Sequence, residues 1–214
     1  MQAILFTSIL FALVSGLYTL RSGYGPQVIL WSFIGLSLVS ELTAYYMATN
    51  YRNNMPVFHF FSPVLFALLC LYFNRISPTV SKYNLAYFSL IACVAISALN
   101  SAYFQPIHTM NSNYLLLEGL FGCGMALIAL YDFLRDDNNP FIYRSIHFWM
   151  TLTMLFHYLG TYIVYLVILL LKEIGAGRND LVTAYTFLWL IAVLTYIAVG
   201  VTFMLFPAKK IKNG

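Results

Sequence analysis

Long apolar stretches alternate with short polar breaks along the whole chain. A membrane-spanning helix needs roughly 20 apolar residues, with a usual range of about 17 to 25. Seven stretches qualify, and they cover residues 2–20, 28–50, 56–73, 83–104, 114–134, 142–171 and 181–206. The breaks between them are rich in Pro, Gly, Asn and Asp, which favour turns. The pattern therefore predicts seven transmembrane helices in a single domain over residues 1–214.

The composition excludes an ordinary soluble domain. The chain is 61% hydrophobic and only 8% charged, whereas soluble domains carry about 25% charged residues. Too few polar side chains exist to cover a globule in water, so lipid is the expected solvent. The predicted fold class is all-α, a polytopic membrane protein built as a seven-transmembrane-helix bundle with membrane lipids as its surroundings.

The basic residues predict the orientation of this bundle. With seven spans, eight Lys and Arg residues fall on one side of the membrane: Arg21, Arg75, Lys82, Arg135, Arg144, Lys209, Lys210 and Lys212. The other side has three: Arg52, Lys172 and Arg178. Because Lys and Arg collect on the cytoplasmic side, the N-terminus is predicted outside and the C-terminus in the cytoplasm. The net charge of +4 is thus explained by topology, and no nucleic-acid partner is expected.

Two acidic residues interrupt the apolar cores. Glu41 lies in the stretch 28–50 and Glu118 in the stretch 114–134. A charged side chain at the centre of a bilayer costs about 2.5 to 3.5 kcal/mol on insertion scales, so it usually faces the bundle interior or a water-filled cavity. Two interpretations remain open. Each glutamate is part of a ligand, proton or metal site, or it is a protonated side chain that ties two helices together.

Other polar residues fall at the same depth as the glutamates. By the predicted topology, five helices bring polar groups to the outer half of the bundle. The expected ligand-binding set is Glu41, Tyr45, His59, Asn100, Glu118, His157 and Thr161. A spacing of four residues places Glu41 and Tyr45 on one helix face, and His157 and Thr161 on another. Small polar residues at this spacing also serve as packing contacts between helices, which is the structural alternative.

Several known activities of membrane proteins lack their motifs here. The stretch 181–206 contains neither a lysine for a retinal Schiff base nor the histidines with which ceramidase-type hydrolases bind metal. The chain has no H-E-x-x-H, G-x-S-x-G or P-loop sequence. The three cysteines lie in apolar runs without metal-ligand spacing, which favours buried thiols. The sequence therefore predicts no particular cofactor or metal and leaves both open.

Two segments resemble a known group of proteins. SELTAYYMATNYRNNMPVFHFF joins a glutamate-bearing helix to an Asn-Asn turn and another helix, and NPFIYRSIHFWMTLTMLFHYLGTYIVYL carries an FW pair ahead of an aromatic residue and a glycine. Together they resemble small seven-helix membrane proteins of bacteria, whose module also serves as the membrane sensor of some histidine kinases. The resemblance implies a bacterial cytoplasmic (inner) membrane and a shared pattern that includes Glu41, Asn54 and Trp149. No kinase follows in this sequence, so a separate cytoplasmic signalling partner is expected.

Three functions remain open from the sequence. The first is a receptor-like or sensory membrane protein that binds a small or lipid-like ligand, or a cation, in the outer-half pocket. The second is an intramembrane lipid-modifying enzyme with a glutamate as general base and His59 or His157 as its partner or metal ligand. The third is a pore-forming or membrane-perturbing effector, although the sequence has no ring of like charges that would line a pore.

Overall fold

The chain folds into helices joined by short connections. The computed structural model describes residues 2–20, 25–136 and 141–206. The helices are α1 (Gln2–Leu20), α2 (Gly25–Tyr51), α3 (Met55–Ile76), α4 (Pro78–Lys82), α5 (Leu85–Tyr103), α6 (Ser112–Arg135), the 3-10 helix η1 (Ile142–Arg144), α7 (Ile146–Glu173) and α8 (Arg178–Leu205). No strand occurs within these described ranges, which confirms the all-α fold class.

Six of the described helices, α2, α3, α5, α6, α7 and α8, are long and apolar enough to cross a membrane. They indicate an integral membrane protein with several spans. The apolar part of α1, Gln2–Leu17, is shorter than the others, so a seventh span stays a prediction. The orientation also remains a prediction, because Arg21 and the basic residues after Phe206 lie outside the described part of the chain.

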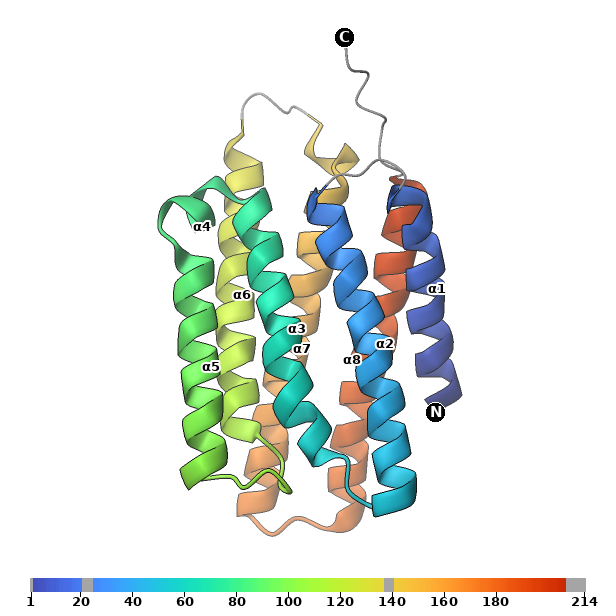
Figure 1. Cartoon of the computed structure of the whole chain (residues 1–214), viewed down its shortest axis with the longest axis vertical. Helices are drawn as coiled ribbons and strands as arrows, with labels where there is room; N and C mark the ends of the chain where they lie inside the picture. Colours follow the sequence, from blue (N-terminus) through green and yellow to red (C-terminus); the bar gives the residue numbers. More distant parts are fainter. Residues whose placement is uncertain (1, 21–24, 137–140, 207–214) are drawn as a thin grey trace.

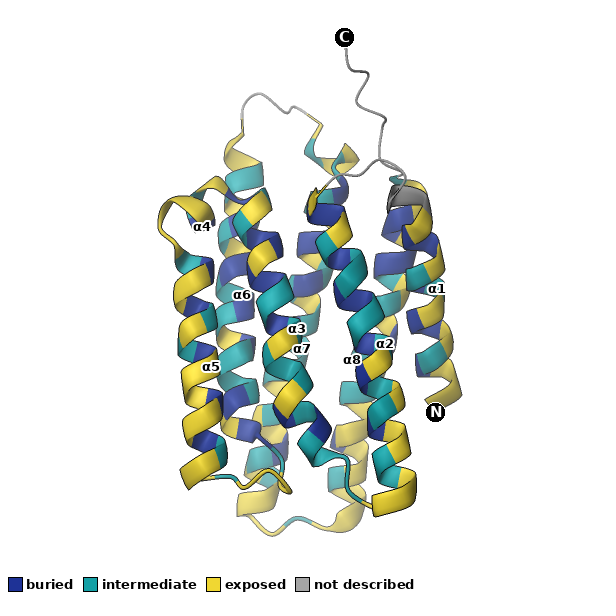
Figure 2. Ribbon diagram, in the orientation of Figure 1, coloured by how far each residue is buried: buried dark blue, intermediate teal, exposed yellow. Residues whose placement is uncertain are grey.

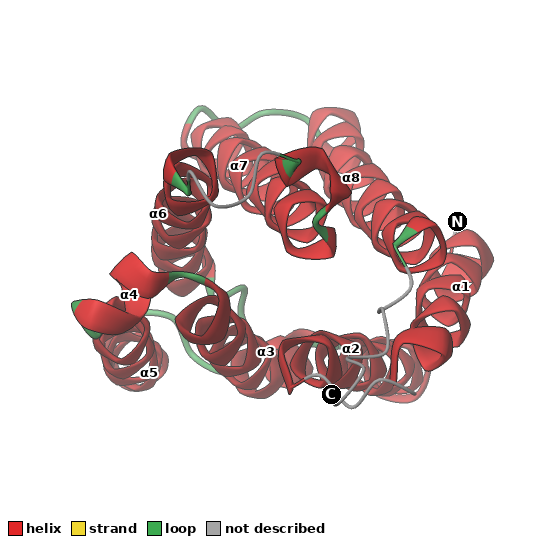
Figure 3. Ribbon diagram, turned by 90° about the horizontal axis from the view of Figure 1, so that it is seen from above, coloured by secondary structure: helices red, strands yellow, loops and turns green. Residues whose placement is uncertain are grey.

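Six helices form a closed ring in the order α1, α2, α3, α6, α7 and α8 (Figure 3). The ring closes where α8 packs against α1, and α5 lies outside it, in the seam between α3 and α6. Successive long helices run in opposite directions (Figure 1). The α4 end of the bundle is the end that holds α4 and the starts of α2, α5 and α7. The Asn54 end holds the turn between α2 and α3 and the starts of α6 and α8.

The ring interior is filled most completely toward the α4 end. Large side chains that are fully buried concentrate there, among them Phe66, Tyr72, Phe73, Met150, Met154 and Phe203. They belong to one continuous hydrophobic core that includes residues from α1, α2 and α6. Close packing of this kind leaves little void volume. The α4 end is therefore the solid half of the bundle.

The outward faces of the helices are exposed and largely apolar (Figure 2). Phe88 and Ile91 of α5, Leu120 of α6 and Phe156 of α7 are examples. A soluble monomer rarely exposes apolar surface on this scale, whereas a surface in lipid needs it. The burial pattern therefore agrees with a bundle that is surrounded by membrane lipids.

The connection between α3 and α5 contains an element that the apolar pattern did not predict. The short helix α4 begins after Ser77, whose Oγ accepts a hydrogen bond from Val80 N at 3.1 Å. Ser77 Oγ in turn donates to Asp132 of α6, which also accepts a hydrogen bond from Thr79 N at 3.0 Å. Asp132 thus satisfies donors at the start of α4, where a helix leaves its first N–H groups unpaired.

Helix α7 begins four residues after residue 142, where the sixth span was predicted to start. Residues 142–144 form η1, the backbone is extended at Ser145, and α7 begins at Ile146. Trp149 fixes this bend because its indole Nε1 donates to Tyr143 O at 2.8 Å. The break falls at the polar pair Arg144 and Ser145, which a long apolar and aromatic stretch surrounds.

Helices α6 and α7 approach each other closely at Gly122. A Cβ atom added there would lie 2.6 Å from the Tyr158 ring, and Tyr158 is buried. Only glycine therefore leaves room for this ring between the two helices.

We expect the substitution Gly122→Ala to lower the stability of the bundle by about 1–3 kcal/mol, because the added methyl group overpacks the Tyr158 contact. Thermal unfolding of the purified protein in detergent measures the effect. Gly124→Ala is the matched control, since nothing lies within 4 Å of a Cβ atom at that position and alanine favours a helix more than glycine. Equal melting temperatures for the two variants would contradict this packing.

Candidate functional site

A cavity of about 340 Å³ lies inside the ring, on the side of the solid core that faces the Asn54 end. Its wall comes from α2, α3, α6, α7 and α8, with one residue of α1, Leu5. Most of the wall is apolar or aromatic, and a few polar side chains reach it. A concave site of this volume and character is typical of small-molecule pockets.

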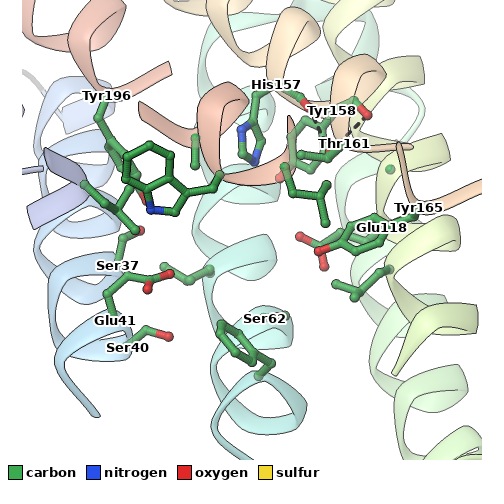
Figure 4. A pocket seen from close by; sticks show the side chains of 18 of the residues that line it. Ser37, Ser40, Glu41, Ser62, Glu118, His157, Tyr158, Thr161, Tyr165 and Tyr196 are labelled. Carbon is green, nitrogen blue, oxygen red and sulfur yellow. Dashed lines mark hydrogen bonds between the residues drawn. The ribbon is translucent and has the colours of Figure 1, made fainter. Parts of the chain in front are cut away.

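Glu41 of α2 and Glu118 of α6 face each other across this cavity (Figure 4). Their helices are separated in the ring by α3, so the two carboxylates stand on different walls. Among the described residues, no Lys or Arg lines the cavity. Among the described side chains that line the cavity, none carries a fixed positive charge that would balance two ionised carboxylates.

The carboxylate of Glu118 keeps acceptor capacity that no protein group uses. Its Oε2 atom is buried and has no hydrogen-bond partner. The Tyr114 hydroxyl, one turn earlier on the same helix face, is also buried and lies close enough to interact with the Glu118 carboxylate, but not in normal hydrogen-bond geometry. Buried polar atoms in native proteins are nearly always hydrogen-bonded, so an unpaired carboxylate oxygen at a cavity calls for an explanation.

His157 of α7 presents a second acceptor to the cavity. Thr195 Oγ1 donates its hydroxyl proton to Ile191 O at 2.8 Å, so it accepts the hydrogen bond from His157 Nδ1 at 3.2 Å. In the neutral imidazole, the proton on Nδ1 leaves Nε2 as an acceptor. The hydrogen bond to α8 thus sets both the ring orientation and the tautomer.

Aromatic side chains form much of the remaining wall. Tyr158 and Tyr165 come from α7, and Tyr185, Trp189 and Tyr196 come from α8. Sequence reasoning proposed no residue of α8, although Tyr185, Trp189, Ala192 and Tyr196 recur at the helical spacing i, i+4, i+7 and i+11. This spacing places the four residues on one face of α8 and was the feature of the sequence that could have indicated the α8 wall. Ser62 of α3 also lines the cavity and was not predicted.

The structure brings together four of the seven predicted site residues: Glu41, Glu118, His157 and Thr161. Thr161 Oγ1 donates to His157 O at 2.8 Å, so its hydroxyl lies beside the histidine on the same face of α7. Tyr45, His59 and Asn100 do not line this cavity. The structure places each of the three outside this cavity, for a different reason in each case.

Tyr45 lies at the outer surface of α2, where its side chain is exposed. A step of four residues advances a helix by about 400°, which leaves a drift of about 40° per step. Two steps from the cavity-lining Ser37 therefore turn Tyr45 away from the interior. Its ring makes an edge-to-face contact with Phe6 of α1 at a centroid distance of 6.1 Å.

His59 connects α3 to α5 instead of facing the cavity. Its Nδ1 lies 2.7 Å from Ser101 Oγ, and its Nε2 lies 2.8 Å from Thr109 O in the connection after α5. A carbonyl oxygen only accepts, so Nε2 carries the proton. The neighbouring residue Phe58 lines the cavity, and one residue along a helix turns the side chain by about 100°.

Asn100 belongs to α5, which lies outside the ring, so its side chain cannot reach the interior. Its Nδ2 donates to Asn111 Oδ1 at 2.6 Å and to Gln105 Oε1 at 2.8 Å. Its Oδ1 accepts from Asn113 Nδ2 at 2.9 Å. This amide cluster anchors the connection between α5 and α6 and is a structural element of the Asn54 end.

Within the described ranges, no three His, Cys, Asp or Glu side chains come together as metal ligands. A scan against known protein families, a search of curated proteins and a search of solved structures each found no match. The function is therefore argued from the geometry and chemistry of the cavity.

We expect His59→Ala to lower stability by about 1–3 kcal/mol, because it removes the two hydrogen bonds of a buried imidazole, each worth about 0.5–1.5 kcal/mol. His108→Ala is the control, since the His108 side chain is exposed and exposed substitutions usually change stability by less than about 0.5 kcal/mol. Melting temperatures in detergent compare the two. A role for His59 as a linker fails if both variants melt like the unmodified protein.

Proposed function

We propose that this chain is a receptor-like or sensory membrane protein that binds a small ligand or a cation in the cavity between α2, α3, α6, α7 and α8. We further propose seven spans in a bacterial cytoplasmic membrane, with the N-terminus outside, so that the cavity lies in the outer half. The observation that carries the proposal is one cavity in which Glu41 and Glu118 face each other.

The energetics of the membrane support a binding role. Two carboxylates at this depth cost several kcal/mol unless something balances or protonates them, and ionisable residues retained inside a membrane usually serve function. Purely structural glutamates would be hydrogen-bonded to a neighbouring helix. Glu118 Oε2 has no such partner, so the carboxylate is poorly explained as a tie between helices.

A route for signalling follows from the helices that line the cavity. α6 and α7 both contribute to its wall and both continue to the α4 end, where residues 136–145 connect them. Trp149 joins the start of α7 to η1 through its hydrogen bond to Tyr143 O. A ligand that draws α6 and α7 together would bias this connection, provided that it binds one arrangement better than the other. Residues 137–140 of the connection lie outside the described residues. A separate cytoplasmic partner would bind one arrangement of this connection in preference to the other.

An intramembrane lipid-modifying enzyme is the second candidate. The observation in its favour is that the Glu118 carboxylate and the His157 imidazole share one cavity, since both groups serve as general bases. The pore hypothesis gains no comparable support. Side chains of the hydrophobic core fill the ring toward the α4 end, and a pore needs a continuous path.

The proposal predicts that a screen of uncharged, anionic and cationic small molecules and salts will raise the melting temperature for at least one compound. Ala192→Phe should abolish the shift, because Ala192 lines the cavity and a phenyl ring fills space that the ligand needs. Thermal unfolding of the protein in lipid nanodiscs measures both effects.

The glutamates provide the second half of this experiment. Glu41→Gln and Glu118→Gln should reduce the shift, while Glu173→Gln should leave it unchanged, because Glu173 is exposed at the end of α7 and does not line the cavity. A ligand whose shift survives Ala192→Phe and both cavity glutamine variants does not bind here, and the proposed site is then wrong.

A further inference from the structure

We infer that the ligand is a small organic dication, a short linear diamine whose two ammonium groups bind Glu41 and Glu118 from inside the cavity. This inference rests on the proposed function and adds the chemical class of the ligand. Four features of the cavity support it: the balance of charge, the placement of the carboxylates on separate walls, the acceptor atoms of Glu118 and His157, and the aromatic part of the wall.

The balance of charge points to two positive groups. Two carboxylates line the cavity, and no Lys or Arg among the described residues does so. Removing one partner from a buried ion pair is strongly unfavourable because the remaining charge is uncompensated. A monovalent cation would leave the other carboxylate either protonated or uncompensated, whereas a dication compensates both in their ionised forms.

The placement of the carboxylates favours two separated charges over a single ion. Metal ligands must converge to within about 2.0 to 2.6 Å of one ion. Glu41 and Glu118 stand on α2 and α6 and face each other across the cavity (Figure 4). The described part of the chain brings no three potential ligands together. A chain with one ammonium group at each end matches carboxylates on two walls.

The hydrogen-bonding groups favour ammonium over a quaternary amine. An ammonium group offers three N–H donors. Glu118 Oε2 is an unused acceptor, and neutral His157 offers Nε2 because its Nδ1 donates to Thr195 Oγ1. Charge-assisted hydrogen bonds from ammonium to carboxylate are among the stronger ones in proteins. A quaternary amine has no N–H group to donate.

The aromatic wall suits the rest of such a molecule. Tyr165 of α7 and Trp189 and Tyr196 of α8 line the cavity. Aromatic faces attract alkylammonium groups, with tryptophan the most effective, and they also offer apolar surface to the methylene chain between two ammonium groups. The same wall would bind a strongly hydrated inorganic ion only weakly, because such an ion has no apolar surface to contact it.

The test compares three molecules with the same four-carbon chain: 1,4-diaminobutane, 1-butylamine and 1-butanol. Isothermal titration calorimetry on the protein in nanodiscs measures each affinity. We expect the diamine to bind at least about tenfold more tightly than the monoamine, since one charge-assisted hydrogen bond is worth that much, and the alcohol to bind more weakly than either.

Variants assign the effect to residues. Glu41→Gln and Glu118→Gln should each reduce the affinity for the diamine to about that of the monoamine, while Glu173→Gln should leave it unchanged. Trp189→Leu removes the aromatic face and keeps an apolar wall, so it should weaken binding of both amines several-fold. Circular dichroism and size-exclusion chromatography establish that each variant is folded. If a glutamine variant misfolds, the inference is tested by the affinities of the three molecules and by the Trp189→Leu variant.

Two sets of results overturn the inference in distinguishable ways. If the monoamine or the alcohol binds as tightly as the diamine, or if only one glutamate affects the diamine, the ligand is not a dication bound at both ends. The proposed function survives that result as long as Ala192→Phe abolishes binding. If none of the three molecules binds and the wider screen also gives no shift that depends on Ala192, the inference and the proposed function both fail.

Discussion

Hydrocarbon cannot hydrogen-bond to a protein, and this constraint governs the placement of every polar group in the bundle. Backbone groups are satisfied within helices, and side chains must find partners on neighbouring elements or around an enclosed space. In the ring of six helices the outward faces are largely apolar, and the interior holds an apolar core together with the buried polar side chains. What distinguishes the polar residues from one another is whether another part of the chain satisfies them.

Most buried polar side chains are satisfied and serve to fasten connections. His59 ties α3 to α5, Asn100 anchors the segment before α6, and Asp132 holds the start of α4. Glu118 and Trp189 are different, because Glu118 Oε2 and the Trp189 indole Nε1 are buried without a partner and both residues line the cavity. The contrast between satisfied linkers and an unsatisfied carboxylate is the physical basis for assigning the cavity, and not the two ends of the bundle, to function.

The sequence predicted where along the bundle the polar residues lie better than whether their side chains face the ring interior. A helix occupies each of the seven apolar stretches, because about 20 apolar residues identify a membrane helix by length alone. Glu41, Glu118 and His157 share a cavity as expected, since position within a stretch determines depth. Direction depends on how helices are arranged around the ring, which one sequence does not reveal. Asn100 lies at a suitable depth, but α5 is outside the ring.

The contact between α1 and α8 has a consequence for how the protein is made. These are the first and last helices of the described chain, and their packing closes the ring. The chain of α1 is synthesised long before that of α8, so the ring stays open until α8 packs against α1. Until then the Glu41 side chain lacks the α8 wall of its cavity. The cavity is therefore completed late in synthesis, once the last helix of the described chain is in place.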